Sequence, residues 1–245
     1  MSLFLDQPVE TVGLTMPPPG RTRFPMPLPR FAKLDEQKKA DILLVASEEF
    51  AALGYEKASL NTIIARCGMS KGAMYYYFSD KDDLYRTVLE EFLEELFKIW
   101  TGGSGDRHRP FDEVQTREAY WEEWAAHYRR SLHHYLKNPV YGEIFHRCLR
   151  SRASGTSHPA LTEVAEQIRE WIAAVLKRGE RLGAVRNDLP EGLLLDTAFG
   201  MLEGFDRWIF REWANLSEEE IDEIAGLVTV FLRRIVEPVV VEQGG

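Results

Sequence analysis

The apolar residues of this chain recur every three or four positions from Asp35 nearly to the C-terminus. Ile42, Ala46, Phe50 and Leu53 begin this pattern. Such a recurrence is typical of helices that turn one face toward a core. No stretch of alternating β-branched residues is long enough to suggest a sheet. We therefore predict an all-α fold of about nine helices.

Glycine and proline divide this helical pattern into segments. A Gly-rich break occupies residues 101–111, and Pro139, Pro159 and Pro190 stand where helices begin, a position at which proline is tolerated. The expected helices cover residues 35–53, 59–67, 70–77, 80–100, 112–137, 140–150, 159–182, 190–213 and 217–237. The helix expected to end near Trp100 is long enough to link two domains.

Composition sets limits on the class of protein. The chain is 44% hydrophobic and 28% charged, which is ordinary for a soluble globular protein. No apolar run is long enough to span a membrane, and we expect no signal peptide, because the first residues show no basic segment followed by an apolar one. Cys67 and Cys148 lie far apart and outside any CxxC motif, so we expect reduced thiols in a cytoplasmic protein.

The net charge of −9 is unevenly distributed. Residues 21–81 hold ten Lys and Arg against seven Asp and Glu, whereas residues 82–245 hold twenty against thirty. Binding to phosphates depends on the charge of one face and not on the whole-chain sum. This division is compatible with a mildly basic DNA-binding domain joined to an acidic body.

Residues 59–78 carry the strongest local signals. Ser59 and Ser70 are each suited to cap a short helix, and Gly68 suits the turn between the two helices because glycine tolerates a positive φ. Two short helices joined in this way form a helix-turn-helix, whose second helix enters the major groove of DNA. That helix is expected to present these residues: Lys71, Gly72, Ala73, Tyr75 and Tyr76.

A buried aromatic core is the alternative interpretation of Tyr75, Tyr76 and Tyr77. Three consecutive helical residues span about 200° of the helix, so all three cannot be buried together. Tyrosine on such a surface can donate to phosphates and pack on thymine methyl groups. We therefore favour a role in DNA binding for this cluster.

The run SLNTIIARCGMSKGAMYYYFSDKDDLY, with the residues before it from Ala46, resembles the DNA-binding domain of the TetR family of repressors. The resemblance rests on several separate signals: Phe50, Gly54, Gly68, Ser70-Lys71-Gly72, Tyr75, Phe78, Lys81 and Leu84. It implies that the following residues contact DNA: Ser59, Asn61, Lys71, Gly72, Ala73, Tyr75, Tyr76 and Lys81. Tyr77 can face the core or a phosphate. Ile64 stands where the family usually has alanine, which can shift the crossing of the two helices.

These boundaries define three expected parts. Residues 1–30 form a disordered or extended tail, because they hold seven of the twelve prolines. Residues 31–81 form a three-helix DNA-binding domain, and residues 82–245 a helical regulatory and dimerisation domain. The tail could contact DNA through Arg21, Arg23 and Arg30. The simpler interpretation is that it is a solvated segment without a role in binding.

Two heptad-like stripes near the C-terminus suggest a dimer. One includes Phe205 and Trp208, and the other includes Val228, Phe231 and Ile235. Two such helices can pair with a twofold copy as a four-helix bundle. Gly200 and Gly204, four residues apart, are then explained by a close helix crossing at that interface. The alternative is that the stripes only close the core of the monomer.

The remaining helices are rich in aromatic residues, and the family resemblance implies a ligand pocket among them. The candidate lining residues are Trp100, Trp124, Tyr128, Phe145 and Trp171. Such a pocket would be largely apolar, whereas ordinary core packing explains the same residues without a ligand. The effector expected from this composition is a small hydrophobic or aromatic molecule.

Histidines gather between residues 108 and 146, namely His108, His127, His133, His134 and His146. His127 and His134 share a helix face and offer two metal ligands, but no Cys or carboxylate completes a site, so we expect surface or pocket-rim histidines and no metal or other cofactor.

The leading hypothesis is a DNA-binding repressor, a homodimer that leaves its palindromic operator when an effector binds. One alternative is an all-α sensing module that no longer binds DNA. Another is a helical enzyme that uses Cys148 or His146, but no orienting triad is evident and we expect no enzyme.

Overall fold

The computed structural model describes residues 29–102, 109–154, 158–212 and 216–238. Within these ranges every regular element is an α-helix, which confirms the predicted fold class. The helices are α1 (Pro29–Ala32), α2 (Glu36–Lys57), α3 (Leu60–Arg66), α4 (Lys71–Tyr77), α5 (Lys81–Trp100), α6 (Arg109–Glu113), α7 (Arg117–Lys137), α8 (Pro139–Ser154), α9 (Pro159–Arg181), α10 (Glu191–Glu212) and α11 (Glu218–Val236). Sequence reasoning missed the two short helices α1 and α6.

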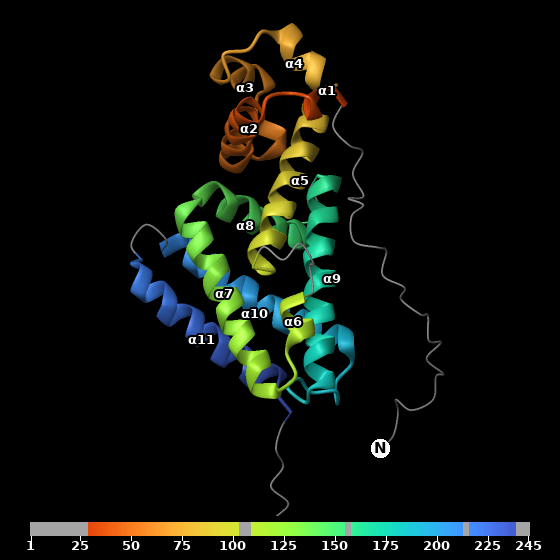
Figure 1. Ribbon diagram of the computed structural model, residues 1–245, viewed down its shortest axis with the longest axis vertical. Coiled ribbons are helices and arrows are strands. Elements are labelled where there is room, and N and C mark those ends of the chain that lie inside the picture. The colour runs from red at the N-terminus through yellow and green to blue at the C-terminus, as the bar shows by residue number, and fades with distance from the viewer. Residues whose placement is uncertain (1–28, 103–108, 155–157, 213–215, 239–245) are drawn as a thin grey trace, which may run out of the picture.

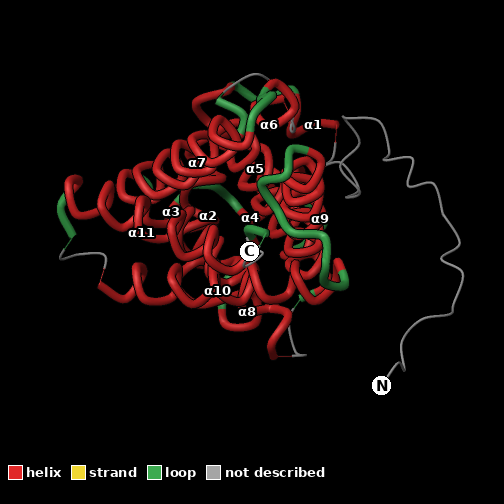
Figure 2. The backbone as a smooth tube through the Cα atoms, turned by 90° about the horizontal axis from the view of Figure 1, so that it is seen from below, coloured by secondary structure: helices red, strands yellow, loops and turns green. Residues whose placement is uncertain are grey.

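The helices form two regions joined by α5 (Figure 1). We call residues 29–80, with α1 to α4, the head, and the described residues from 109 to 238, with α6 to α11, the body. Helix α5 begins in the head and descends into the body, a length of about 30 Å for its 20 residues. Viewed from below, the body is a bundle of helices in which α7 lies beside α11 (Figure 2).

Side chains cap the helices of the head. Ser59 Oγ accepts a hydrogen bond from the Thr62 amide at 3.3 Å, and Ser70 Oγ accepts one from the Ala73 amide at 3.1 Å. Asp80 caps α5 through the amide of Asp83 at 2.9 Å. Each bond satisfies an amide that the first helical turn leaves unpaired. The predicted starts of these three helices are confirmed.

The core of the head follows the predicted stripe except at its end. Ile42, Ala46 and Phe50 are buried, but Leu53 is 46% exposed. The chain leaves the helical conformation at Gly54, where φ is 72°, so the face that contains Leu53 is not continued. Tyr55 takes over the packing instead, with its ring centroid 6.5 Å from that of Phe50.

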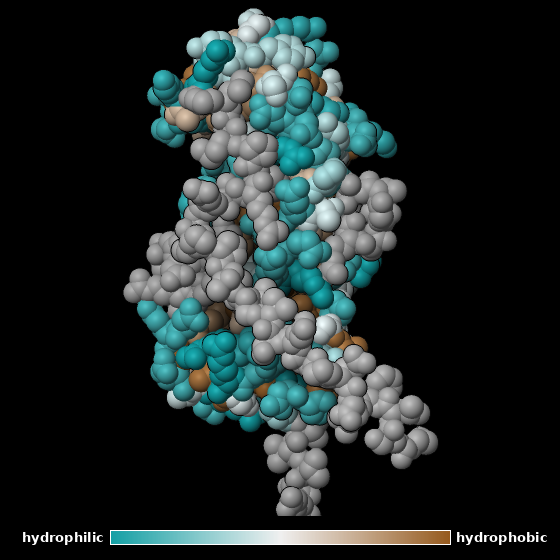
Figure 3. Space-filling model, turned by 90° about the vertical axis from the view of Figure 1, so that its right-hand side faces the viewer, coloured by the Kyte–Doolittle hydropathy of each residue, from teal (hydrophilic) through white to brown (hydrophobic). Residues whose placement is uncertain are grey.

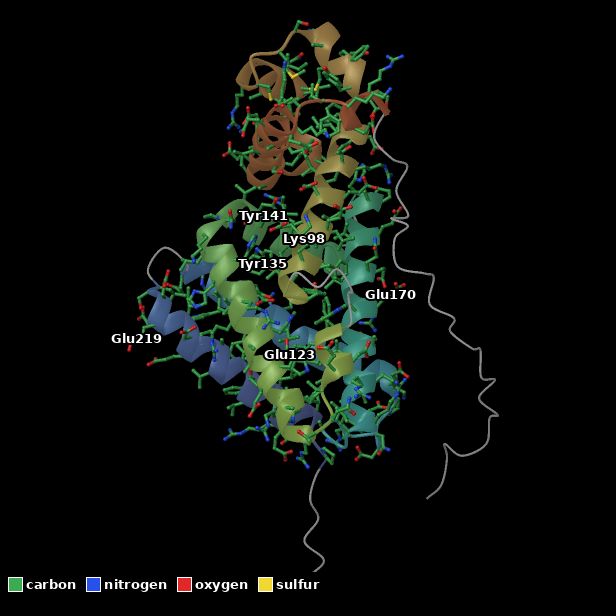
Figure 4. The ribbon with its side chains drawn as sticks, viewed as in Figure 1. Lys98, Glu123, Tyr135, Tyr141, Glu170 and Glu219 are labelled. Atoms are coloured by element: carbon green, nitrogen blue, oxygen red, sulfur yellow. The ribbon has the colours of Figure 1, made fainter. Side chains whose placement is uncertain are left out.

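The body encloses an aromatic interior behind a polar surface. Tyr135 lies inside the bundle, whereas Glu170 and Glu219 lie on its outer edges (Figure 4). The described surface seen from the right-hand side of Figure 1 is mostly hydrophilic, with small hydrophobic spots (Figure 3). Among the described helices, none combines the length and apolar character needed to cross a membrane.

The proline-rich tail falls almost entirely outside the described residues, as do Arg21 and Arg23. The expected end of the tail at residue 30 lies within α1, whose Phe31 packs on Phe78 of the head at a centroid distance of 4.8 Å.

Candidate functional site

One exposed surface of the head contains most of the predicted DNA contacts. Tyr75 and Tyr76 on α4 are 53% and 52% exposed, and Lys71 at the start of the same helix is also exposed. Asn61 on α3 is exposed nearby in sequence, and α3 packs against α4. A short helix that carries exposed tyrosines and a lysine has the form of a recognition helix.

The remaining predicted contacts, Gly72, Ala73 and Ser59, have less side chain available to contact DNA. Gly72 is exposed and has no side chain, so a DNA backbone could approach the helix closely at that position. Ala73 is half-buried. The hydroxyl of Ser59 is engaged as the cap of α3. A contact of Ser59 with DNA therefore has to use the hydroxyl while it caps the helix, or the adjacent backbone.

Lys81 differs from the other candidates because its ammonium points into the protein. Nζ donates to the backbone oxygens of Tyr55 at 2.7 Å and Ala58 at 3.3 Å, and it lies 4.3 Å from the centroid of the Tyr55 ring. These carbonyls lie at the end of α2, where helical partners are lacking. Lys81 thus has a structural role at the base of the head, which the prediction of a phosphate contact did not anticipate.

Arg30 belongs to the same surface, although it was absent from the predicted contact set. Its guanidinium lies 4.7 Å from the ring centroid of Tyr76, and the side chain is exposed. The sequence grouped Arg30 with the tail arginines, and the short α1 that holds it beside α4 has no strong sequence signal. Arg30 adds a second cation to the exposed face of α4.

Tyr77 and Ile64 complete the inner side of this surface. Tyr77 is half-buried and packs edge-on against Phe31 at 6.5 Å, so it turns toward the core. Ile64 is 6% exposed, and its carbonyl accepts a hydrogen bond from Met69 in the turn. Gly68 in that turn has a φ of 62°, which is the conformation that favours glycine.

Two residues of the body, Arg147 and His158, make polar contacts with the head and with the first turn of α5. Arg147 of α8 donates from Nε to the backbone oxygen of Ala51 at 2.8 Å, which binds it to the end of α2. His158, which caps α9, lies 2.6 Å from Asp82 Oδ1 of α5 and stacks on Tyr55 at 4.2 Å. Burial raises the pKa of Asp82, but Arg86 and His158 outweigh it and hold that pKa below its ordinary value.

A narrow cavity in the body brings together all five aromatic residues that the sequence selected as ligand candidates. These are Trp100, Trp124, Tyr128, Phe145 and Trp171, and they come from α5, α7, α8 and α9. The free space is about 40 Å³. The rings of Trp100 and Trp171 lie 4.4 Å apart, so the cavity is closely walled by aromatic faces.

Several polar atoms face an aromatic environment in this cavity. Tyr128 donates a hydrogen bond of 2.6 Å to Oδ1 of Asp206, which is 3% exposed on α10. His127 Nδ1 and Tyr135 Oη are buried and have no hydrogen-bond partner among the described residues. Buried polar groups are normally paired, so this cavity offers unused donors and acceptors.

Burial governs the protonation of Asp206 and His127 in the cavity. It raises the pKa of Asp206 to about 7, although the hydrogen bond from Tyr128 partly opposes this shift. It lowers the pKa of His127 to about 3, with a further contribution from the charge of Arg130. His127 is therefore neutral at physiological pH, and the charge of the cavity is set by Asp206.

His127 also corrects the expectation of surface or rim histidines. It is 4% exposed, and its ring stacks on Trp171 at 4.8 Å. His134 is half-buried against Tyr141 at 5.3 Å, and His133 pairs with Asp222 at 2.8 Å. His108 lies outside the described residues.

No three His, Cys, Asp or Glu side chains within the described ranges form a group able to hold a metal ion. Cys148 is fully buried, which raises the pKa of its thiol well above the ordinary value. A buried thiol with a raised pKa is a poor nucleophile.

The predicted dimer residues divide between the core and the surface. Trp208 and Phe231 are 43% and 45% exposed, and Phe205 packs on Phe231 at 5.4 Å. A methyl group added at Gly200 or Gly204 would meet no neighbouring side chain within 4 Å, so both glycines lie on an open face of α10. Ile235 is half-buried.

Val228 was placed wrongly in that set, since it is 1% exposed and belongs to the core of the monomer. The two apolar stripes of α11 are adjacent: Ile221 and Val228 face inward, while Leu227 and Phe231 face outward. A seven-residue spacing alone did not separate them, because an α-helix has 3.6 residues per turn.

Comparison with known proteins agrees with this geometry. Residues 42–88 match the family described as bacterial regulatory proteins, tetR family. The transcriptional activator FasR of Mycolicibacterium smegmatis is 35% identical over 79 residues, which are 32% of this chain and 34% of FasR. The transcriptional regulator SrpR of Pseudomonas putida is 22% identical over 203 residues, 83% of this chain and 87% of SrpR.

Solved structures share the whole fold. A TetR-family regulator from Chloroflexus aurantiacus superposes with a TM-score of 0.61 at 20% identity, covering 88% of this chain and all of that one. FadR of Bacillus subtilis, solved in complex with stearoyl-CoA, gives a TM-score of 0.61 at 17% identity over 79% of this chain and 96% of FadR.

A capped helix-turn-helix with an exposed recognition helix, joined to a helical body, defines a DNA-binding transcriptional regulator. The match over residues 42–88 is more specific, because it assigns the helix-turn-helix of this chain to the tetR family of bacterial regulatory proteins. The solved structures add that the fold of the body is also shared with TetR-family regulators.

Proposed function

We propose that this regulator is a homodimeric repressor that binds a palindromic operator and releases it when a small molecule occupies the cavity of the body. The observation that carries the proposal is the exposed face of α4, where Lys71, Tyr75 and Tyr76 project beside Arg30. Lysine and arginine suit phosphates, and tyrosine suits phosphates and thymine methyl groups. The body supplies the site at which DNA binding is regulated.

The cavity supports an effector that is small and aromatic or hydrophobic. Its walls are aromatic, and its free space of about 40 Å³ is well below the roughly 150 Å³ in which an engineered protein cavity holds benzene. FadR of Bacillus subtilis was solved with stearoyl-CoA, but a long acyl chain requires far more space than this cavity has. An effector of this chain must move the lining rings even when it is small.

That movement has a direct route to the head. Trp100, the last residue of α5, lines the cavity, while Lys81 at the first residue of α5 holds the end of α2. A ring that displaces Trp100 tilts α5, and a rigid helix transmits the tilt to the head. The contacts of Arg147 and His158 with the head then have to rearrange as well. Such an element with two arrangements is what allosteric coupling requires.

The dimer uses the open face of α10 and α11. Trp208, Leu227 and Phe231 are each more than 40% exposed there, although large apolar side chains are normally covered. Gly200 and Gly204 keep the face of α10 flat enough for a second copy to approach. Two heads held by one dimer read two half-sites, which multiplies operator affinity.

The test is an electrophoretic mobility shift with DNA from upstream of the chain's own gene and with duplexes selected from random sequence. We expect a palindromic duplex to be shifted by two chains, with affinity that falls steeply as salt rises. Trp208→Glu should leave a folded chain that is monomeric in sedimentation and binds the operator at least tenfold more weakly. The absence of salt-sensitive specific binding in both DNA sets would refute the proposal.

A further inference from the structure

The cavity contains one ionisable group whose placement the aromatic packing does not explain. Asp206 lies on α10 with its side chain 3% exposed, and among the described residues its one hydrogen-bond partner is Tyr128. A carboxylate removed from water is unfavourable unless it is paired with a cation or is protonated. An apolar residue at this position would suit a simple core better.

No basic side chain of the cavity wall balances Asp206. The lining residues include no Lys or Arg. The neighbouring Arg130 does not line the cavity: its Nη2 pairs with Glu123 at 2.7 Å and reaches the Trp100 carbonyl at 3.5 Å, and its charge is not among those that shift the pKa of Asp206. Within the described part of the chain, the carboxyl of Asp206 therefore faces a cavity with no positive charge of its own.

The rest of the wall suits a positive charge. The rings of Trp100, Trp124 and Trp171 surround the space, with Tyr128 and Tyr135 beside them. Aromatic faces are negative and attract cations, most strongly where water is excluded. His127 would oppose a cation if it were charged, but burial lowers its pKa to about 3, so it stays neutral.

We propose that the cavity binds an organic cation, a protonated amine or quaternary ammonium on an aromatic body, with its charge against Asp206 and its ring among the tryptophans. The proposal rests on the proposed function only in taking this cavity as the effector site. The ligand charge would convert an unpaired buried carboxyl into a buried ion pair. The unpaired His127 Nδ1 and Tyr135 Oη remain available for a polar substituent of the ligand.

Three probes of one shape and different charge test this assignment. Benzylamine is a cation at about pH 8, benzyl alcohol is neutral and benzoate is an anion. Their binding to the full chain is measured by calorimetry and by fluorescence of the cavity tryptophans. We expect benzylamine to bind at least tenfold more tightly than benzyl alcohol, and benzoate to bind most weakly.

Two variants locate the preference. Asp206→Asn keeps the shape of the side chain and removes its charge, so the advantage of benzylamine should vanish while the affinity for benzyl alcohol stays within about twofold. Glu203→Gln removes a neighbouring negative charge that does not line the cavity, and it should keep the preference. If Asp206→Asn fails to fold, Asp206→Ser, which also removes the charge, takes its place and should lose the preference in the same way.

Equal or tighter binding of benzyl alcohol by the wild-type chain overturns the cation assignment, as does an unchanged preference in Asp206→Asn. Failure of all three probes to bind at millimolar concentration also overturns it. Operator binding by the ligand-free protein is measured in parallel. A chain that prefers benzylamine but binds no operator refutes the proposed function alone, and a chain that binds operator without this preference refutes the cation assignment alone.

Discussion

The head and the body of this regulator use their polar and aromatic residues in opposite ways. In the head, polar side chains cap helices at short sequence distance, and the tyrosines of α4 are exposed. In the body, the aromatic residues are buried, and polar atoms such as His127 Nδ1 are buried with them, without a partner among the described residues. A surface that reads DNA needs exposed groups on a stable support, whereas a cavity that receives a ligand needs unsatisfied groups away from water.

The same comparison predicts that the two regions respond differently to mutation. Substitutions on α4 should alter DNA binding at constant stability, because the affected side chains contact little of the protein. Substitutions in the cavity should alter stability and ligand binding, and operator affinity should follow only through the orientation of α5.

The largest expected effect is in the body. Trp171→Ala removes a ring that contacts Trp100 at 4.4 Å and His127 at 4.8 Å, and should lower the free energy of unfolding by about 3–5 kcal/mol. Urea unfolding at fixed protein concentration measures it. Leu44→Ala, where the leucine is 53% exposed on α2 and lies outside the proposed dimer face, is the control and should cost less than about 1 kcal/mol. Equal losses would mean that the cavity walls are not the core of the body.

The second effect belongs to the head. Lys71→Ala combined with Tyr75→Ala should weaken operator binding about a hundredfold, or ~2.7 kcal/mol. The free energy of unfolding should change by no more than about 0.5 kcal/mol, because both side chains are exposed. Fluorescence anisotropy with a labelled operator measures the affinity. The control is Lys98→Ala, which removes an exposed lysine from the body end of α5 and should leave operator affinity unchanged. If the double variant also kept its operator affinity, a sensing module without DNA binding would be favoured.

The third effect tests the buried carboxyl through pH. The pKa of Asp206 is raised to about 7 in the folded protein, chiefly by burial, so the folded state keeps a proton that the unfolded state has lost. The resulting stability is present below the unfolded pKa and is lost as pH rises toward 7. Asp206→Asn should therefore gain about 4 kcal/mol over the wild type between pH ~4 and ~8. Parallel pH profiles of urea unfolding would contradict the shifted pKa.

The smallest effect compares two helix caps. Ser70→Ala removes the cap of α4 and Ser217→Ala removes the cap of α11, and each should lower the free energy of unfolding by about 1 kcal/mol. Only Ser70→Ala should also weaken operator binding, severalfold, because α4 carries the proposed DNA contacts. If both variants weakened operator binding equally, the head would not be the separate DNA-binding region.

The sequence predicted the head more completely than the body because its signals are local. Ser59, Gly68 and Ser70 act on residues within three positions of themselves, and all three behave as expected. The contacts of Lys81 within the protein were not anticipated because its partners at Tyr55 and Ala58 lie more than twenty positions away. Arg30 was grouped with the arginines of the tail because α1 has little helical signal of its own.

In the body, helix positions were predicted from periodicity, and the five aromatic cavity residues were selected from composition together with the pocket that the family resemblance implies. The pairing of Tyr128 with Asp206 was not, since the two residues are 78 positions apart and nothing in either local sequence indicates the other. The interpretation of Val228 failed for a related reason. Two adjacent stripes on one helix have the same spacing, and only the packed structure shows which stripe faces inward.

The salt dependence of operator binding tests the central claim, that the exposed face of α4 reads DNA, most directly. A lysine that contacts a phosphate contributes about one unit to the slope of log affinity against log salt concentration. We expect Lys71→Ala to reduce this slope by about one unit, and Lys98→Ala to leave it unchanged. An unchanged slope in Lys71→Ala, with wild-type operator affinity, would contradict the account.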